Sequence, residues 1–289
     1  MTFTLFALVL TAGLLHAMWN FVARRMSGNL AVFWWAMWIG GIVMIPVILW
    51  VAIPQGGAAY FAMLQRGALF ILTTGTIHTF YFYLLARAYR DGEISVVYPV
   101  ARGSGIGLTA FLGWLLLDEP ISLMGLAGIV LVSGGILSMG MSVVRRNPQA
   151  MHSFRSALGV GATIVGYSIV DKFGVKVVHP TTYISGMFFI TALLMWPSVD
   201  RRFKGKLWER LRIDWGAILL IGVGSVTTYL MILFALTMGP VSYIVAMREF
   251  AVIVGAILGF VFLKEPVTRG KVGAILAIAA GLICIKMGG

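Results

Sequence analysis

The sequence predicts an all-α integral membrane protein whose ten transmembrane helices form two inverted five-helix repeats. Three observations predict this fold: an apolar composition, ten apolar segments of membrane-spanning length, and a match between the two halves of the chain. Of the 289 residues, 60% are hydrophobic and 11% are charged, whereas a soluble domain usually carries roughly 25% charged residues. The net charge of +12 does not indicate nucleic-acid binding, because the cations cluster in short gaps between apolar segments.

The number of spans follows from the thickness of the bilayer. A hydrocarbon core about 30 Å thick needs about 20 apolar helical residues, and ten segments meet this requirement. The first is expected to be a retained helix and not a signal peptide, because it lacks a basic start and continues through His16 toward Arg24. The expected spans are 3–23, 31–52, 67–88, 95–117, 121–142, 156–176, 181–198, 215–237, 241–263 and 268–286.

The two halves match each other residue by residue. Asp118-Glu119-Pro120 lies 146 positions before Lys264-Glu265-Pro266, and the same offset relates Arg102 to Arg248. Each copy has five spans, an odd number, so the second copy must enter the membrane from the opposite side. Such inverted repeats are typical of alternating-access transporters. The expected organisation is a first repeat over 1–145, a polar linker over 146–155 and a second repeat over 156–289.

Charge in the connections predicts an orientation. The loops that follow odd-numbered spans hold 16 cations and the loops on the other side hold only 3. By the positive-inside rule, this places both termini outside the cytoplasm.

Arg102, Arg248 and Glu249 lie within expected spans, where an ionised side chain costs at least about 2.5–3.5 kcal/mol unless it faces a cavity or a partner. Snorkelling to the interface would be a structural explanation for the arginines. Their equivalence in the repeat favours a cavity, in which guanidinium groups could bind a carboxylate, phosphate or phosphonate. For Glu249, an ion pair with Arg102 and a role in proton coupling remain open alternatives.

Further polar and aromatic side chains are expected to face the same interior. His16 and Asn20 share a helix face with Trp19, and the repeat places Tyr167 and Asp171 at the matching positions; an interfacial Asp171–Lys172 ion pair is the structural alternative. Pro99, after Tyr98, is expected to interrupt its helix. The candidate substrate-binding residues are His16, Trp19, Asn20, His78, Tyr98, Arg102, Tyr167, Asp171, Tyr229, Arg248 and Glu249.

These motifs resemble those of a known family. They are residues 16–20 (HAMWN), residues 88–99 (AYRDGEISVVYP), residues 239–243 (GPVSY) running to Arg248-Glu249, and the endings Glu119-Pro120 and Glu265-Pro266. The chain is similar over its whole length to the EamA-type transporters of the drug/metabolite transporter superfamily. The resemblance implies ten helices in two inverted halves, a central cavity, and outward secondary transport of small metabolites. It also implies cytoplasmic termini, which conflicts with the charge count and leaves orientation open.

The first functional interpretation is a secondary transporter, in the exporting direction, of a small anionic or zwitterionic metabolite such as an amino acid or aminophosphonate. It would work by alternating access, and proton coupling is a hypothesis. A cation or drug exporter using Glu249 or Asp171 is the alternative, and a lipid-linked sugar flippase is a third.

Enzyme chemistry is not indicated. The four histidines form no His-Glu-x-x-His motif, and the chain has no Gly-x-Ser-x-Gly elbow and no Walker-type lysine loop. We therefore expect no catalytic residues, metal or cofactor. The expected partners are a small-molecule substrate, the lipid bilayer and, under the coupling hypothesis, protons, with no nucleic acid and with a monomer sufficient. The expected location is the cytoplasmic (inner) membrane, as a multi-pass protein.

Overall fold

A computed structural model describes the chain except for residues 27–28, 92–93, 147–150, 263 and 265–266. The described ranges are almost entirely helical. The elements are α1 (Phe3–Arg25), α2 (Leu30–Val43), α3 (Ile45–Ala52), the 3-10 turn η1 (Ile53–Gln55), α4 (Gly57–Asp91), α5 (Ile94–Leu117), α6 (Leu123–Arg146), α7 (Met151–Gly174), α8 (Pro180–Phe203), α9 (Leu207–Met238), α10 (Val241–Met247), α11 (Phe250–Phe262) and α12 (Arg269–Gly288).

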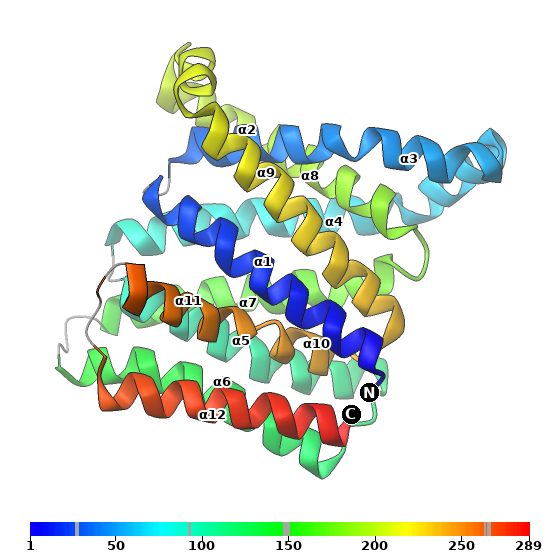
Figure 1. Cartoon of the computed structure of the whole chain (residues 1–289). Coiled ribbons are helices and arrows are strands. Elements are labelled where there is room, and N and C mark those ends of the chain that lie inside the picture. The colour runs from blue at the N-terminus through cyan, green and yellow to red at the C-terminus, as the bar shows by residue number, and fades with distance from the viewer. Residues whose placement is uncertain (27–28, 92–93, 147–150, 263, 265–266) are drawn as a thin grey trace.

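The helices run back and forth between two ends of the molecule, side by side (Figure 1). Nine spans within the described residues are long and apolar enough to cross a bilayer, and α2–α3 and α10–α11 each form one of them. The 24-residue α7 packs along α4 and α5 and takes the place of the tenth. Large apolar side chains such as Trp50, Leu123 and Met287 are exposed on the outer surface, as expected where lipid is the solvent. The predicted all-α membrane fold is confirmed.

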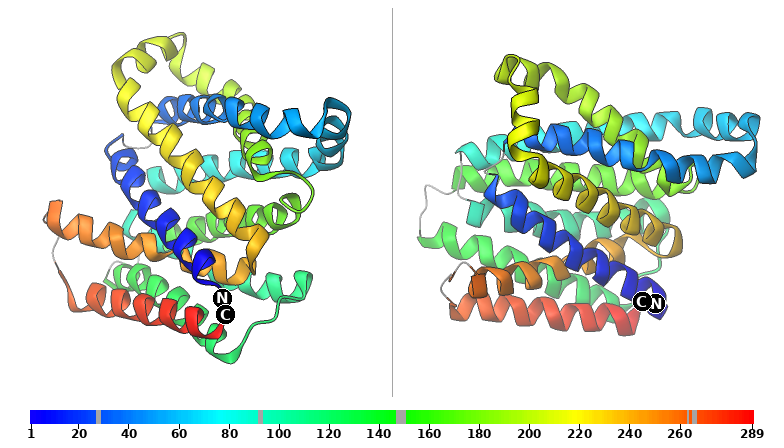
Figure 2. Two further views of the ribbon diagram at one scale, coloured as in Figure 1. Left: turned by 45° about the vertical axis from the view of Figure 1, so that its right-hand side comes forward. Right: turned by 45° about the horizontal axis from the view of Figure 1, so that its top comes forward.

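Both termini lie at one end of the molecule, which we call the terminal end (Figures 1 and 2). The exposed basic segment from Arg201 to Lys206 lies at the opposite end, as does the start of α12 with Arg269 and Lys271. We call this the basic end. The placement agrees with the charge asymmetry of the sequence, and which end faces the cytoplasm stays a prediction.

The packing shows the two-fold relation between the repeats. α1 packs on α9 as α7 packs on α4, and α6 packs on α12. In the α6–α12 contact, a Cβ on Gly281 would lie 2.7 Å from the carbonyl oxygen of Gly128, and a Cβ on Gly135 would lie 3.1 Å from that of Ala274. The 146-residue offset converts the first of these contacts into the second. The predicted inverted repeats are therefore present, with small residues at their shared contact.

One expected span has an interruption that the sequence did not predict, and one expected interruption is wrong. The span expected over 241–263 is present as Val241–Phe262, but it consists of two helices, because α10 ends at Met247 and α11 begins only at Phe250, leaving Arg248 and Glu249 in a turn. The interruption expected at Pro99 is absent, because α5 runs through this residue. Pro99 is the sixth residue of α5, so its missing N–H removes one hydrogen bond near the start of the helix, and α5 continues in spite of this loss.

The close approach of α6 and α12 gives a stability prediction. A Cβ on Gly128 would lie 2.6 Å from the carbonyl oxygen of Gly281, whereas a Cβ on Gly134 of the same helix would meet nothing within 4 Å. Gly128→Ala should destabilise the protein by about 1–3 kcal/mol, the usual cost of overpacking, and lower the midpoint of thermal unfolding in detergent. Gly134→Ala is the control and should leave the midpoint unchanged or raised. Equal midpoints for both variants would contradict the packing described here.

Candidate functional site

The break between α10 and α11 places Arg248 and Glu249 in the protein interior. All seven residues of α10 are buried, and the chain bends where the amide of Glu249 donates to the carbonyl of Ala246 (3.2 Å). Helix α1 passes close by, because a Cβ on Gly13 would lie only 3.3 Å from the carbonyl oxygen of Arg248. Broken helices at membrane depth are tolerated where the backbone is buried in protein or lines a cavity, and they often form binding sites.

Arg102 and Glu249 form a buried ion pair between the two repeats. Arg102 Nε donates to Glu249 Oε2 at 3.0 Å and Nη2 donates to Oε1 at 2.5 Å, so the contact is bidentate. The side chains are 6% and 1% exposed. The Arg102–Glu249 ion pair, which the sequence analysis gave as one alternative for Glu249, is therefore present. Arg102 neutralises the negative charge of Glu249.

Arg248 is also buried, at 4% exposure, and it has weaker partners. Its Nη2 donates to the Tyr167 hydroxyl at 3.4 Å, and its Nε lies 3.9 Å from Glu249 Oε1. This Nε has no hydrogen-bond partner within the described part of the chain. Together Arg102, Glu249 and Arg248 carry one net positive charge, and the unpartnered donor belongs to Arg248.

Helix α1 contributes His16 and Trp19 to the same region. The His16 ring lies within range of the charges of both Arg102 and Arg248, and it meets the Trp19 ring edge-on, with centroids 5.0 Å apart. Trp19 packs on Gly224 of α9, and its buried Nε1 is a second donor without a partner among the described residues. Asn20 lies one turn after His16 and is partly exposed, as His16 and Trp19 are, and its role stays a prediction.

An aromatic cluster lies beside Arg248. His78 of α4 stacks on Tyr167 of α7, with ring centroids 4.3 Å apart and an interplanar angle of 27°. Tyr229 of α9 meets His78 edge-on at 5.6 Å, and Tyr81 meets Tyr167 edge-on at 6.1 Å. The sequence predicted His78, Tyr167 and Tyr229 at the site and missed Tyr81, which follows His78 by three residues on the same helix face.

Asp171 accepts hydrogen bonds only from hydroxyl groups in the described structure. It is fully buried, and Thr74 (2.6 Å) and Tyr183 (2.8 Å) donate to its Oδ1 while Tyr229 donates to its Oδ2. The alternative of an Asp171–Lys172 ion pair is wrong. Lys172 Nζ instead donates to the carbonyls of Leu236 (2.7 Å) and Gly239 (2.6 Å), at the C-terminal end of α9.

Three residues with defined roles were missed by sequence reasoning, and one predicted residue is not placed. Thr74 lies one turn before His78, a spacing that could have identified it, but Tyr183 gave no signal because it lies on a separate span. Glu119 was noticed only as part of a repeated motif. The side chain of Tyr98 lies outside the described residues, so its predicted role is not assessed.

At the terminal end, Glu119 links the α5–α6 connection to the start of α10. Its carboxylate accepts hydrogen bonds from the amides of Val241 (2.6 Å) and Ser242 (3.1 Å), at the first turn of α10, and from the Ser242 hydroxyl (2.6 Å). A carboxylate at a helix N-terminus is favourable because the amides there lack partners within the helix.

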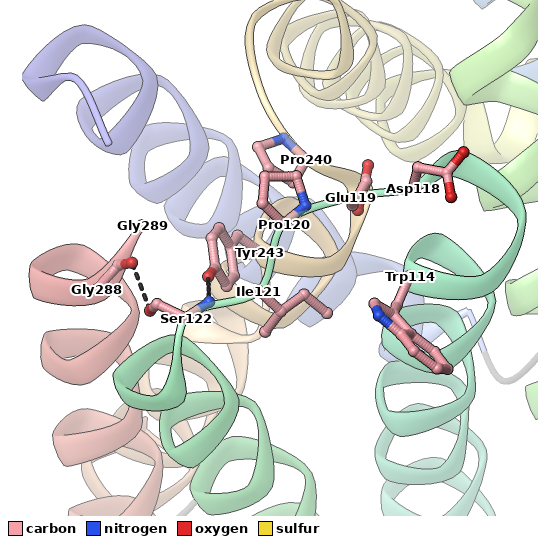
Figure 3. A pocket seen from close by; sticks show the side chains of 10 residues that line it. All are labelled: Trp114, Asp118, Glu119, Pro120, Ile121, Ser122, Pro240, Tyr243, Gly288 and Gly289. Atoms are coloured by element: carbon pink, nitrogen blue, oxygen red, sulfur yellow. Dashed lines mark hydrogen bonds between the residues drawn. The ribbon is translucent and has the colours of Figure 1, made fainter.

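A hollow of about 700 Å³ opens beside Glu119 (Figure 3). Nearby, Tyr243 accepts from the Ser122 amide (3.0 Å) and the Ser122 hydroxyl donates to the Gly288 carbonyl (2.6 Å). Arg102, Arg248 and Asp171 do not line this hollow. The α5–α6 connection, the start of α10 and the C-terminus form its walls. The hollow is therefore part of the packing of the terminal end and is separate from the residues around Arg248.

Comparison with known proteins gives the family. The model of the EamA-like transporter family matches residues 4–141 and again residues 155–287, once for each repeat. This chain belongs to the EamA-like transporter family. It is also similar to the uncharacterized transporter YwfM of Bacillus subtilis (strain 168), with 26% identity over 213 residues that cover 70% of this chain and 68% of that protein.

The EamA-like fold is also found among solved structures. A crystal structure matches with a TM-score of 0.72 and 17% identity, covering 98% of both chains. At this identity the likeness shows the fold alone. Family membership establishes that the chain is a multi-pass membrane transporter, as the motifs indicated. The substrate site of this EamA-like protein is therefore inferred from the chemistry of its own residues.

The buried ion pair of this EamA-like protein gives a second stability prediction. Removing one partner leaves a charge without its counter-ion in the interior, which costs about 3–5 kcal/mol. Glu249→Gln should therefore lower the thermal unfolding midpoint strongly, and the double change Arg102→Met with Glu249→Met should recover most of the loss. Arg210→Gln is the matched control, because Arg210 is 44% exposed and pairs with Asp214 at 3.6 Å; exposed pairs contribute only about 0–1 kcal/mol. If Glu249→Gln lowered the unfolding midpoint only as much as Arg210→Gln does, this result would argue against a buried ion pair.

Proposed function

We propose that this transporter carries a small anionic or zwitterionic metabolite whose carboxylate or phosphonate binds Arg248. The observation that supports this is the Nε donor of Arg248, which is buried and lacks a partner among the described residues. A buried donor left unsatisfied costs about 1–3 kcal/mol, and more when it is charged. An anion placed there regains that free energy and neutralises the net positive charge of Arg102, Glu249 and Arg248.

The surroundings of Arg248 suit such a ligand. Trp19 Nε1 offers a second unpartnered donor on the α1 face that carries His16. On the other side, the rings of Tyr167, Tyr229 and His78 form an aromatic wall. A protonated amine binds favourably over such rings, at about 0.5–2 kcal/mol. A ligand with an acidic group and an amine, such as an amino acid or aminophosphonate, would use both features.

The transport cycle that we propose is alternating access between the two inverted repeats, in the exporting direction, in the cytoplasmic (inner) membrane. Similar packing of matched helices, α1 on α9 and α7 on α4, supports two related arrangements. The competing cation exporter has less support. Glu249 already binds Arg102 through both oxygens, and Asp171 is covered by three hydroxyl groups.

The test is uptake and efflux in proteoliposomes with radiolabelled amino acids, aminophosphonates and quaternary amines. We expect saturable flux of an acid or zwitterion in the wild type. Charge-assisted hydrogen bonds contribute about 1.5–3 kcal/mol, so Arg248→Gln should weaken apparent affinity by about ten- to a hundredfold. Arg248→Lys should restore little, because an ammonium lacks the planar fork of guanidinium.

The control for the uptake test is Arg212→Gln, which removes an exposed arginine far along the chain from the break. It should transport like the wild type. Flux of quaternary amines that survives Arg248→Gln and fails in Glu249→Gln would overturn the anion assignment and support the cation exporter.

A further inference from the structure

Asp171 is a buried carboxylate that the proposed anion site does not use. It is 0% exposed. The groups that face it come from three helices: Thr74 and His78 from α4, Tyr183 from α8 and Tyr229 from α9. The neighbouring Lys172 is directed to the end of α9. The helices α5 and α10 also pack on α7; α5 carries Arg102, and Arg248 follows the last residue of α10. Arg102 is bound to Glu249, and Arg248 contacts Tyr167 of α7.

The coordination of Asp171 limits what can bind to it. Both of its oxygens already accept hydrogen bonds, from three hydroxyl groups, and no surface of the side chain is exposed. An amine or metal cation would have to displace these hydroxyl groups. A proton needs no such space, because on Oδ2 it reverses the hydrogen bond to Tyr229, so that the Tyr229 oxygen accepts and its own hydrogen turns away. The proton comes from bulk water and leaves to bulk water.

A chain of polar contacts leads from Asp171 toward Arg248. The Thr74 hydroxyl that donates to Asp171 lies 3.3 Å from His78 Nδ1, and this nitrogen lies 2.9 Å from the Thr74 carbonyl oxygen. His78 stacks on Tyr167, whose hydroxyl accepts from Arg248. Tyr229 bonds to Asp171 and lies against both rings. A changed hydrogen bond at Asp171 therefore alters the wall of the proposed anion site.

The charges of the interior give the coupling ratio. Four buried ionised groups lie around the aromatic cluster and the α10–α11 break, namely Arg102, Arg248, Glu249 and Asp171, and their formal charges sum to zero when Asp171 is ionised. The other buried carboxylate of the described residues, Glu119, lies at the terminal end on the first turn of α10. An anion bound at Arg248 would make the sum negative, which is costly in a low-dielectric interior. We propose that Asp171 carries the coupling proton of this transporter, with one proton bound at Asp171 for each net negative charge bound at Arg248. Proton and anion then cross in the same direction, so export is driven by the outward concentration gradient of the metabolite and carries protons out with it, whereas an imposed inward proton gradient drives uptake. This inference rests on the proposed anion site, and the two can fail separately.

Glu249 is the less suitable carrier. Protonation of Glu249 would weaken both hydrogen bonds from Arg102 and break the ion pair that joins the repeats. Asp171 has only neutral hydroxyl donors in the described structure, so protonation there changes hydrogen-bond direction without breaking an ion pair. The two carboxylates can therefore be distinguished by matched Asp171→Asn and Glu249→Gln variants.

The first test needs no substrate. Infrared difference spectra of the purified protein in lipid vesicles, recorded between pH about 5 and about 8, detect the carbonyl band of a protonated carboxylic acid. We expect a band that Asp171→Asn removes and that Glu249→Gln and the exposed Asp200→Asn retain. A band unchanged in Asp171→Asn would overturn the proposal. If Asp171→Asn does not fold, Tyr183→Phe replaces it. Loss of one hydrogen bond to the ionised form makes protonation easier, so the band should be larger at pH about 8, and an unaltered band would overturn the proposal.

The second test uses labelled amino acids and aminophosphonates in proteoliposomes with an imposed pH gradient. Wild type should accumulate an anion in response to the gradient. In Asp171→Asn, gradient-driven accumulation should fall at least about tenfold. The variant should still exchange labelled for unlabelled compound, because the Arg248 site is intact. Gradient-driven accumulation equal to the wild type in Asp171→Asn would overturn the proposal. If no panel compound is taken up, the anion site fails; an Asp171-dependent infrared band would then support the proton site alone.

Discussion

The buried ion pair between Arg102 and Glu249 is the constraint on which the interior depends. It joins α5 of the first repeat to the α10–α11 break of the second through two hydrogen bonds. A charge on either side chain alone would be costly in a membrane-embedded interior, so each accounts for the presence of the other. Because Glu249 is committed to Arg102, Arg248 keeps a donor without a partner. Arg248 thus lacks a close counter-ion because Glu249 already neutralises Arg102.

Around Arg248 the repeats are symmetric in their cations and asymmetric in their carboxylates. The 146-residue offset relates Arg102 to Arg248, but it relates Glu249 to Gly103. In α1 and α7, where matched positions lie 151 residues apart (171 − 20), Asp171 matches the neutral Asn20. Both carboxylates near Arg248 therefore belong to the second repeat. The backbone follows the same division, since the helix with Arg102 is continuous and the helix with Arg248 is broken. The two repeats are similar scaffolds, and these differences between them lie at residues that we assign to binding.

Much of this architecture could be predicted from sequence, because a bilayer imposes span length and a repeat imposes register. The inverted halves and the Arg102–Glu249 pair were accessible in this way. The break at Arg248 was not, since no proline or glycine marks it, and it depends on contacts with Gly13 of α1 and the Glu119 carboxylate at the start of α10. The hydroxyl groups around Asp171 were mostly missed, because Thr74, Tyr183 and Tyr229 come from three helices whose relative rotation is set by packing.

The contact between α6 and α12 has a consequence for how such a molecule can move. Exchange of the two repeats converts the Gly128–Gly281 contact into the Ala274–Gly135 contact of the same helix pair. This pair is therefore carried onto itself. The α5–α6 pair, by contrast, is carried onto the α11–α12 pair, and the two differ: α5 packs along α6, whereas α11 touches α12 only briefly (Figure 1). A motion that interchanges the conformations of the repeats must therefore change the packing of those flanking pairs, but it requires no change in the contact between α6 and α12.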